Sequence, residues 1–516
     1  MNLVALLRQR AGLHPDRPAL IDRHRGADRS VSFAELQRRV ERGAARLQDL
    51  GLKRGSTILV FQPVSIELYE ILLAAFHSGL RVMLADPSAG RAFLSLCCER
   101  QPPDAFFGPR KAHLLRWLVP CLRRIPCAIS SKGWFPGAAA WRQSNNSAAL
   151  AEVPDEEPAL ITFTSGSTGV PKAAVRSHGF LLAQHRALEK ALDFTEGEVD
   201  LITLPVFVLA NLASGLTSVL ADTDLRSPGK ADDDAIRTQC ERHAVTRCAA
   251  SPAFFEALLD GGPLPPMHKL YTGGAPVFPD LLERLQAALP EAQVTTVFGS
   301  TEAEPMSHLG AREYDASLVA RTAAGCGLCA GEPVAEVALR IIGDHWGQPH
   351  AKLAPDEFDQ LISPTGQPGE VVVTGDHVLS GYLGGLGDAE TKIRVTNRVW
   401  HRTGDAGYLD EAGRLWLLGR CAAKLPATDR QRPDLPPGAL DYPFAIESAL
   451  RVRHPGLRMA ALGWKGKRVL VTTIPGMEEE AAEFGIETVI RVEAIPMDRR
   501  HNAKVDYGAL AKLLEK

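Results

Sequence analysis

The N-terminal part of the chain alternates between the apolar periods of a helix and of a strand. Residues 32–35 have the Ser-x-x-Glu form of a capping box, and Leu36, Val40 and Leu47 then recur on one helical face. Gly51 follows, at the position where helices commonly end. The pattern predicts a helix from Ser32 to Gly51, strands at 57–61 and 81–85, and a helix over 67–76.

The alternation of apolar strands and helices resumes further along the chain, which predicts an α/β fold built on a mostly parallel sheet. No period of 20–50 residues repeats, so a solenoid or a propeller is not expected. From residue 370 the pattern changes to short strands with turns, which predicts a β-rich subdomain. The expected strands are 159–164, 270–272 and 294–298 in the α/β part, and 370–374, 398–400 and 414–418 in the β-rich part.

A polar, proline-rich stretch at 426–437 is the best candidate for a linker. The residues around and beyond it predict a small α+β unit, with a helix from Phe444, a strand at 469–472 and a final helix from Tyr507. We therefore place a boundary near Arg420. It divides the chain into a large domain, 1–420, and a small domain, 421–516.

Charge and cysteine content narrow the class of protein. The 516 residues carry 58 Lys and Arg against 61 Asp and Glu, a formal charge of −3, which argues against a protein that coats nucleic acid or an anionic membrane. Nine irregularly spaced cysteines predict reduced thiols and a cytoplasmic location. Cys326 and Cys329 have C-x-x-C spacing, but no second pair follows, so we expect a structural role there.

One uncharged stretch, residues 201–221, is long enough to cross a bilayer. It contains a proline, an asparagine and several hydroxyl side chains, and acidic Asp200 and Asp222 flank it without a cluster of Lys or Arg. The first ten residues also lack the pattern of a signal peptide. We expect no stable membrane insertion and interpret 201–221 as a buried element facing an apolar ligand.

Residues 164–172, TSGSTGVPK, follow a predicted strand and combine glycines, hydroxyl side chains and a lysine. Glycines let backbone N–H groups turn toward an anion, hydroxyls add donors and lysine adds charge, which predicts a polyphosphate loop. Pro171 before the lysine excludes a Walker loop, and Ser165 stands where a hydrolase nucleophile elbow needs glycine. The candidate ligands are Thr164, Ser165, Gly166, Ser167, Thr168, Gly169 and Lys172.

Two further strings each follow a predicted strand. The small residues Gly274, Ala275 and Pro276 would let a flat ring approach the backbone, although a tight turn explains them equally well. In the string VFGSTE at 297–302, an aromatic ring could stack on a base, a hydroxyl could bind phosphate and a carboxylate could hold Mg²⁺ beside substrate phosphates. The candidates in this string are Phe298, Gly299, Ser300, Thr301 and Glu302.

The last two strings are polar. Asp405, in the sequence RTGD, could accept hydrogen bonds from both ribose hydroxyls, and Arg420 would add charge near the same nucleotide. An aspartate in such a position is otherwise an ordinary turn residue. The basic string RRHNAK at 499–504 is, by itself, typical of a solvated surface before a helix.

In this order and at these separations, the five strings resemble the adenylate-forming superfamily of acyl-CoA synthetases, luciferases and peptide synthetase adenylation domains. The resemblance runs over essentially the whole chain and implies ATP and Mg²⁺ as cofactors. It implies a large N-terminal domain of two αβ lobes plus a β-barrel-like lobe, and a small, mobile C-terminal domain. The roles it implies are a phosphate loop at 165–172, an adenine platform at 274–276, Phe298 in place of a usual tyrosine, phosphate and Mg²⁺ contacts from Thr301 and Glu302, a ribose ligand in Asp405, and a catalytic lysine in Lys504.

Some positions depart from the family pattern. Many acyl-CoA synthetases carry a histidine in the segment matching 204–211, and this chain has none there. The usual charged hinge residue after Arg420 is missing, since Ala422 and Ala423 follow Cys421, and 425–440 replaces a common Lys-x-x-Gly segment. The strings at 298–305 and 498–504 look closest to the β-lactone synthetases of olefin biosynthesis.

The resemblance therefore implies an ATP-dependent ligase that activates a fatty-acid-like carboxylate, with a 2-alkyl-3-hydroxy acid closing to a β-lactone. The alternatives are an acyl-CoA synthetase or acyl-AMP ligase that loads a thiol, and a non-catalytic nucleotide-binding protein. The expected partner is a small-molecule acyl substrate, with no nucleic acid. Association with other enzymes of lipid biosynthesis is compatible with this hypothesis.

Overall fold

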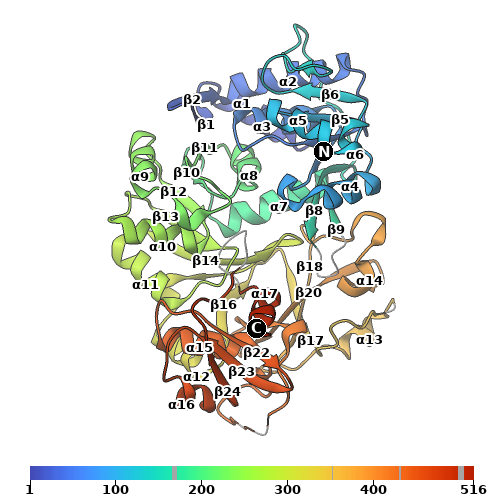
Figure 1. Cartoon of the computed structure of the whole chain (residues 1–516). Helices are drawn as coiled ribbons and strands as arrows, with labels where there is room; N and C mark the ends of the chain where they lie inside the picture. The colour runs from blue at the N-terminus through green and yellow to red at the C-terminus, as the bar shows by residue number, and fades with distance from the viewer. Residues whose placement is uncertain (166–170, 351, 429, 431, 498–504, 516) are drawn as a thin grey trace. The chain divides into compact units, whose positions relative to one another are not determined.

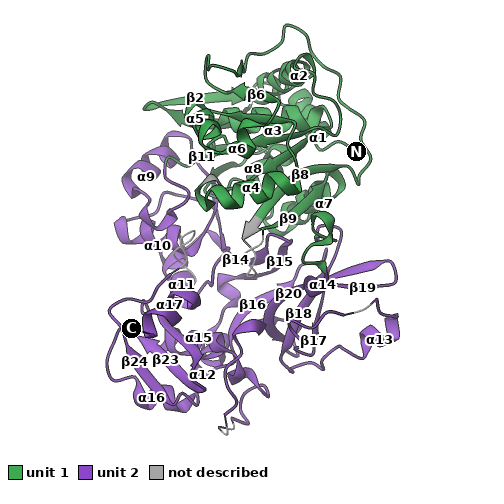
Figure 2. Ribbon diagram, turned by 45° about the vertical axis from the view of Figure 1, so that its right-hand side comes forward, with its two compact units in different colours: residues 1–222, 379–388 green, residues 223–378, 389–516 purple. Residues whose placement is uncertain are grey.

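The computed structural model describes residues 1–165, 171–350, 352–428, 430, 432–497 and 505–515 (Figure 1). The chain separates into two compact units, coloured in Figure 2. Unit 1 comprises residues 1–222 and 379–388, and unit 2 comprises 223–378 and 389–516. Each unit mixes helices with strands, so the predicted α/β class is confirmed at this level.

Unit 1 contains strands of two sheets. In one, the order is β7-β6-β5-β3-β4-β8-β9, parallel except for the antiparallel pair β8/β9. In the other, β10, β11 and β1 are parallel and β2 is antiparallel to β1. Parallel neighbours need long crossovers, which explains the alternating pattern in the sequence. The strands are β1 Pro18–His24, β2 Ala27–Ser32, β3 Thr57–Val60, β4 Arg81–Leu84, β5 Ala105–Gly108, β6 Cys127–Ser130, β7 Ala139–Ala140, β8 Pro158–Ser165, β9 Pro171–Ser177, β10 Val199–Ile202 and β11 Thr217–Leu220, and the helices are α1 Val4–Leu13, α2 Phe33–Asp49, α3 Ile66–His77, α4 Arg91–Arg100, α5 Arg110–Leu118, α6 Pro120–Arg123, α7 His178–Ala191 and α8 Phe207–Ser214.

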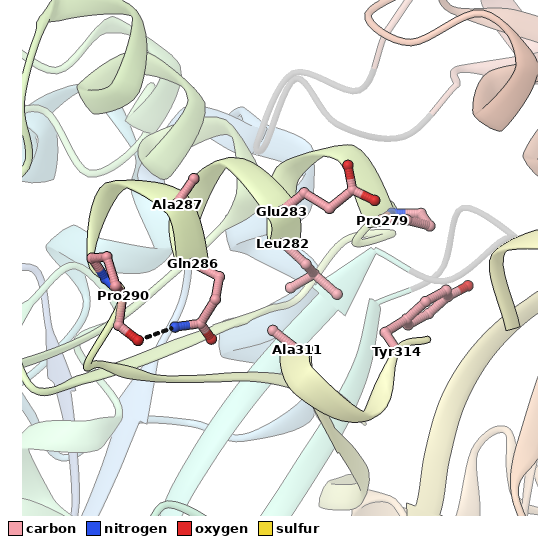
Figure 3. Close-up of a pocket in the computed structure, with 8 residues that line it drawn as sticks. All are labelled: Pro279, Leu282, Glu283, Gln286, Ala287, Pro290, Ala311 and Tyr314. Atoms are coloured by element: carbon pink, nitrogen blue, oxygen red, sulfur yellow. Dashed lines mark hydrogen bonds between the residues drawn. The ribbon is translucent and has the colours of Figure 1, made fainter. Parts of the chain in front are cut away.

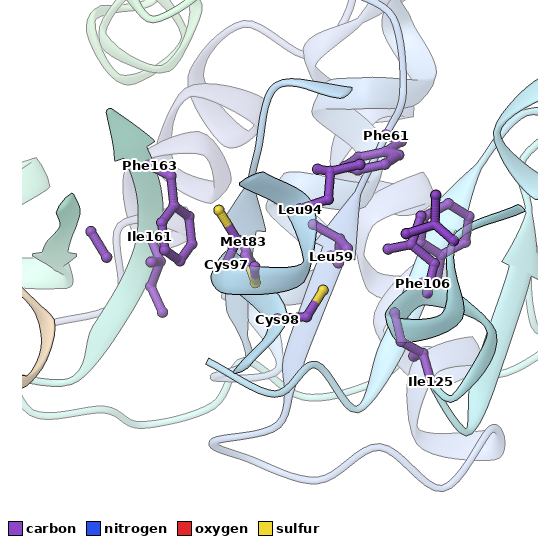
Figure 4. Packing of buried hydrophobic residues seen from close by; sticks show 13 residues of the cluster. Leu59, Phe61, Met83, Leu94, Cys97, Cys98, Phe106, Ile125, Ile161 and Phe163 are labelled. Atoms are coloured by element: carbon purple, nitrogen blue, oxygen red, sulfur yellow. The ribbon is translucent and has the colours of Figure 1, made fainter. Parts of the chain in front are cut away.

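A cluster of buried apolar side chains joins the first of these sheets to α4 (Figure 4). Leu94 and Cys97 of α4 pack with Leu59, Phe106 and Ile161 of the strands. Every residue of β3 and β5 is buried, which is why these strands appear in the sequence as unbroken apolar runs. Burying each large side chain of this kind contributes about 1.5–3 kcal/mol, so the cluster fixes the strands that lead toward the candidate phosphate loop.

The first predicted helix is confirmed as α2. The Ser32 hydroxyl caps it by accepting a hydrogen bond from the Glu35 N–H at 3.3 Å, and Gly51 beyond its end has a left-handed φ of 81°. The Glu35 carboxylate pairs with Arg39 and Arg38, which lowers its pKa. Local sequence signals were sufficient here because a capped helix is specified by neighbouring residues.

The uncharged stretch 201–221 forms the end of β10, the helix α8 and β11. Most of it is buried, as predicted, although Val206 is exposed. Asn211 ties it together by donating to Asp200 Oδ2 at 2.9 Å and to Ser218 Oγ at 3.1 Å. Among the described residues, no helix is long and apolar enough to cross a membrane. That this element faces an apolar ligand stays a prediction.

Unit 2 contains a curved run of strands in the order β17-β18-β20-β21-β16-β15-β14-β13-β12, with β19 paired to β20. The strands β12, β13 and β14 are parallel, and the others are antiparallel to their neighbours. The strands are β12 Arg247–Ala250, β13 Lys269–Gly273, β14 Gln293–Ser300, β15 Ala303–Gly310, β16 Leu328–Pro333, β17 Ala338–Ile342, β18 Gly369–Thr374, β19 Lys392–Val395, β20 Arg398–Leu409 and β21 Leu415–Arg420, and the helices include α9 Asp233–Arg242, α10 Pro252–Gly261, α11 Pro279–Ala288, α12 Ala316–Ala324 and α13 Pro355–Asp359.

One strand of the β-rich part differs from its prediction. We expected residues 398–400, whereas β20 runs over Arg398–Leu409 and includes the RTGD string. Polar residues continue this strand because their side chains have buried partners, as Arg402 has in Glu370. The predicted strand ended too early because we interpreted the polar residues as signals of a turn.

The C-terminal residues of unit 2 form a small α+β sheet, as predicted. In it β22 is antiparallel to β23, which is parallel to β24, and apolar residues from Ala460 to Leu510 form its core. The predicted boundary at Arg420 lies inside unit 2 and stays a prediction, as do the barrel-like lobe and the mobility. The elements are α15 Pro443–Arg453, β22 Met459–Trp464, β23 Lys467–Thr472, α16 Glu478–Glu483, β24 Thr488–Arg491 and α17 Tyr507–Leu514.

The nine cysteines are all free. Cys326 and Cys329 are buried, and burial raises the pKa of the Cys329 thiol to about 11. A thiol with a raised pKa is a poor nucleophile and a poor metal ligand, which agrees with a structural role for this pair.

A buried carboxyl group joins three elements of the C-terminal sheet. Glu447 of α15 accepts hydrogen bonds from the Tyr507 hydroxyl of α17 at 2.5 Å and from the Ala461 N–H of β22 at 2.8 Å. Burial raises the pKa of Glu447 from 4.5 to about 7, although the two hydrogen bonds oppose that rise. Between about pH 4.5 and pH 7 the folded group therefore keeps a proton that the unfolded chain releases.

We expect the stability of this part of the chain to fall as the pH rises from about 4.5 to about 7, because the unfolded chain releases the Glu447 proton first. The loss amounts to roughly 3 kcal/mol above pH 7. Glu447→Gln should remove it. Hydrogen exchange of β22 and β23 at pH 5 and pH 8 measures the effect, with exposed Glu493→Gln as the control. An unchanged pH dependence in Glu447→Gln would contradict this assignment.

Candidate active site

The predicted phosphate loop joins two antiparallel strands of unit 1. Thr164 pairs with Lys172 and Ser165 with Pro171, so the loop leaves β8 and returns into β9. This hairpin places the Lys172 backbone at the base of the loop. Gly166, Ser167, Thr168 and Gly169 lie outside the described residues.

The side chain of Lys172 lies within unit 1 against a segment distant in sequence. Its ammonium nitrogen is 5.6 Å from the centroid of the Tyr382 ring. A Cβ atom on Gly387 would lie 2.7 Å from Lys172 Cε, so the lysine passes directly over that glycine. Sequence reasoning missed both neighbours, because nothing local connects residue 172 to residues 382 and 387.

The predicted adenine platform begins at the carboxyl end of β13 in unit 2. Gly273 pairs with Val297 of β14, and a Cβ atom at residue 273 would lie 2.3 Å from the Val297 carbonyl oxygen. Only glycine fits this approach, and Gly274 follows with a left-handed φ of 76°. Gly274, Ala275 and Pro276 then lie in the connection between β13 and α11.

The string at 297–302 ends β14 at the same edge, because β13 and β14 are parallel. The strand is buried from Val294 to Thr296 and partly exposed from Val297 to Ser300, where Phe298 and Gly299 lie. The structure therefore brings the platform and the Phe298 string together. In open α/β sheets, ligands bind at the carboxyl ends of the strands.

Thr301 and Glu302 form the turn between β14 and β15, since Ser300 pairs with Ala303. Thr301 is exposed and Glu302 partly exposed, so both side chains are accessible to a ligand. A carboxylate oxygen is the ligand type that Mg²⁺ prefers, and one or two carboxylates with substrate phosphates suffice. Glu302 therefore fits the predicted metal role chemically. Within the described parts of the chain, no group of three or more His, Cys, Asp or Glu side chains forms a cage for a metal ion.

The predicted ribose ligand and its neighbour lie opposite each other on β20 and β21. Arg420 Nε is 3.2 Å from Asp405 Oδ1, and Arg420 Nη1 donates to the Thr403 carbonyl oxygen at 2.9 Å. The Asp405 N–H donates to Thr403 Oγ, which itself donates to the Val371 carbonyl oxygen at 2.8 Å. These bonds orient the aspartate and keep a cation beside it.

A buried ion pair holds the strand that carries Asp405. Arg402 lies 2.6 Å from Glu370 of β18, and both side chains are fully buried. Arg402 also donates to the His345 carbonyl oxygen at 3.0 Å, and a Cβ atom on Gly404 would meet the Trp346 ring at 2.9 Å. Burial raises the pKa of Glu370 against the opposing effect of Arg402. Glu370 stands at the start of the apolar sequence EVVV, and a charged residue in that position was a sequence signal for a buried ion pair.

The predicted residues thus group by unit. Unit 2 joins Gly274, Ala275 and Pro276 to the Phe298 string, and joins Asp405 to Arg420. Lys172 belongs to unit 1. Lys504 lies outside the described residues.

A pocket of about 400 Å³ lies on unit 2 beside α11 (Figure 3). Leu282, Gln286, Ala311 and Tyr314 are among its lining residues, and Gln286 Nε2 donates to the Pro290 carbonyl oxygen at 3.0 Å. None of the predicted nucleotide ligands lines it. Its wall is a helix face and a turn, so we assign it no part in the chemistry.

A family model described as AMP-binding enzyme matches residues 7–383, well over half of the chain. This chain belongs to that family. Its resemblance to the adenylate-forming enzymes is therefore confirmed, and ATP-dependent adenylation of a small-molecule carboxylate is its reaction type.

Similar proteins narrow this description. An olefin beta-lactone synthetase from Xanthomonas campestris pv. campestris is 34% identical over 99% of this chain and 97% of its own length. An olefin beta-lactone synthetase from Stenotrophomonas maltophilia is 33% identical over the same shares. This member of the AMP-binding family is thus an adenylate-forming ligase similar to β-lactone synthetases.

A solved structure supports the fold. The amide bond synthetase from Marinactinospora thermotolerans superposes with a TM-score of 0.79 and covers all of both chains at 19% identity. At that identity the likeness concerns the fold alone. The mixed α/β architecture with its small C-terminal sheet is therefore that of the superfamily.

Proposed function

We propose that this ligase activates a 2-alkyl-3-hydroxy fatty acid as its acyl-adenylate and then closes that intermediate to a β-lactone, releasing AMP. The observation that carries the proposal is the 34% identity to an olefin beta-lactone synthetase over 99% of the chain. The buried, uncharged segment 201–221 also suits an apolar acyl group.

In the first step the carboxylate attacks the α-phosphate of ATP and pyrophosphate leaves. Both reactants are anions, so the main task is to offset their repulsion in a site from which water is excluded. Lys172 would bind the outer phosphates, and Lys504 would lie between the carboxylate and the α-phosphate. Thr301 would bind a phosphate, and Glu302 would hold Mg²⁺, which offsets phosphate charge when bound.

The nucleoside would be held by unit 2. Gly274, Ala275 and Pro276 would form the surface on which adenine lies, with Phe298 near the end of the neighbouring parallel strand. Asp405 would accept both ribose hydroxyls, and its orientation by Thr403 and Arg420 supports that role.

The described residues that flank the Lys504 string are held by contacts with other parts of the C-terminal sheet. Met497 pairs with Val505, and the Asp506 N–H donates to the Pro496 carbonyl oxygen at 2.9 Å. Tyr507 then bonds to the buried Glu447. The described residues on both sides of the string are therefore tied to the C-terminal part of the chain.

In the second step the 3-hydroxyl oxygen of the substrate attacks the acyl carbon, the bond to AMP breaks and the hydroxyl proton leaves. A tethered nucleophile of this kind can be worth an effective molarity of about 10⁵–10⁸ M. No separate acceptor has to be admitted. The missing charged hinge residue after Arg420 and the altered stretch 425–440 suit a reaction of that type.

Transfer to a thiol is the second candidate. An indoleacetate–CoA ligase from Aromatoleum aromaticum is 26% identical over 99% of this chain, and ligases of that kind complete the reaction on coenzyme A. The same first step would then precede a bimolecular second one.

We expect Lys504→Ala to abolish substrate-dependent release of pyrophosphate. Loss of one charge-stabilising contact typically costs about 3–4 kcal/mol at the transition state, or a factor on the order of 10²–10³ in rate. A coupled pyrophosphate assay measures it. Lys512→Ala, which removes an exposed lysine of α17, is the matched control and should keep full activity. Near-normal release by Lys504→Ala would refute the role of that lysine.

We also expect multiple turnovers of AMP from ATP and a 2-alkyl-3-hydroxy acid without any thiol, together with a product that mass spectrometry identifies as the β-lactone. The matched acid without the 3-hydroxyl should stop at the bound adenylate. If turnover required coenzyme A or a carrier thiol, the lactone proposal would fail and thioester formation would replace it.

A further inference from the structure

Residues 379–388 form a short segment of unit 1. The flanking residues belong to unit 2, whereas this segment belongs to unit 1. Tyr382 pairs with Ala174 of β9 in an antiparallel bridge, and Leu383 packs against the buried cluster around α4. The segment thus lies beside the strand that carries Lys172.

Two residues of the segment lie against the Lys172 side chain. The Tyr382 ring lies 5.6 Å from the ammonium nitrogen, within the range of a cation–π interaction. A Cβ atom at residue 387 would lie 2.7 Å from Lys172 Cε, 2.9 Å from Cδ and 3.0 Å from Nζ. No side chain larger than hydrogen fits at residue 387 unless the lysine moves.

Asp388 holds the segment that carries Tyr382 and Gly387 in place. Its Oδ1 accepts a hydrogen bond from the Tyr382 N–H at 2.8 Å, and its Oδ2 lies where a Cβ atom on Gly381 would approach to 2.8 Å. One carboxylate therefore closes residues 381–388 into a compact loop. The loop presents the ring and the glycine to the lysine together.

We propose that Tyr382 and Gly387 are positioning residues that hold the Lys172 ammonium in place for the phosphates of ATP. A free lysine samples many rotamers, and restricting it before binding removes an entropic cost from each binding event. The inference rests on the proposed role of Lys172, and it adds residues from a segment outside the five strings.

Gly387→Ala tests the contact between residue 387 and Lys172, and Gly384→Ala is its matched control. Both glycines have a left-handed φ, 95° at residue 387 and 65° at residue 384, so both substitutions carry a backbone penalty. A Cβ atom at residue 384, however, meets nothing within 4 Å. We expect Gly387→Ala to weaken binding of a non-hydrolysable ATP analogue by about tenfold in calorimetry, and Gly384→Ala to change it less than about twofold. Thermal unfolding of each variant reports whether it is folded.

Substitutions of Tyr382 provide a second, independent test. Tyr382→Phe keeps the ring and should bind the analogue as the unchanged protein does, whereas Tyr382→Leu should weaken binding by about threefold to tenfold. In a Lys172→Met background, Gly387→Ala and Tyr382→Leu should have no further effect, because both act through the lysine.

Equal binding by Gly387→Ala and Gly384→Ala, or full additivity with Lys172→Met, would overturn the proposed positioning of Lys172. Binding of the analogue does not depend on the acyl substrate, so this result stands whether or not the lactone proposal holds. Failure of the unchanged protein to bind the analogue would instead overturn the ATP site itself.

Discussion

Repulsion between two anions is the constraint that the proposed chemistry must overcome. A carboxylate must come into contact with a triphosphate, and in a site without water that approach is unfavourable unless positive charges are already in position. Flexible side chains alone cannot supply them, because each would lose rotamer freedom on binding. The protein must therefore hold its cations and hydrogen-bond donors before the reactants arrive.

Buried contacts beneath the candidate ligands meet this constraint. The ion pair of Arg402 and Glu370 fixes the strand from which Asp405 projects, and Thr403 orients that aspartate. The close approach of Gly273 to Val297 brings two ligand strings to one sheet edge. Breaking a buried pair by removing one partner typically costs about 3–5 kcal/mol, so these supports are sensitive to single changes.

Local signals in the sequence predicted much of this architecture. Ser32 and Gly51 bounded the first helix, and the candidate strings around Thr164, Gly274 and Phe298 fell at strand ends, as predicted. The sequence did not predict the full length of β20, because its polar residues are stabilised by partners from distant strands. It also missed Tyr382 and Gly387, since their contact with Lys172 spans about two hundred residues and leaves no local pattern.

The most direct measurement follows oxygen atoms through the reaction. The acid substrate is supplied with both carboxyl oxygens labelled with ¹⁸O, and AMP is analysed by mass spectrometry after turnover. If the carboxylate displaces pyrophosphate from the α-phosphate, AMP must retain one ¹⁸O atom and pyrophosphate none. Unlabelled AMP, or label found in pyrophosphate, would contradict adenylation as the first step of this enzyme.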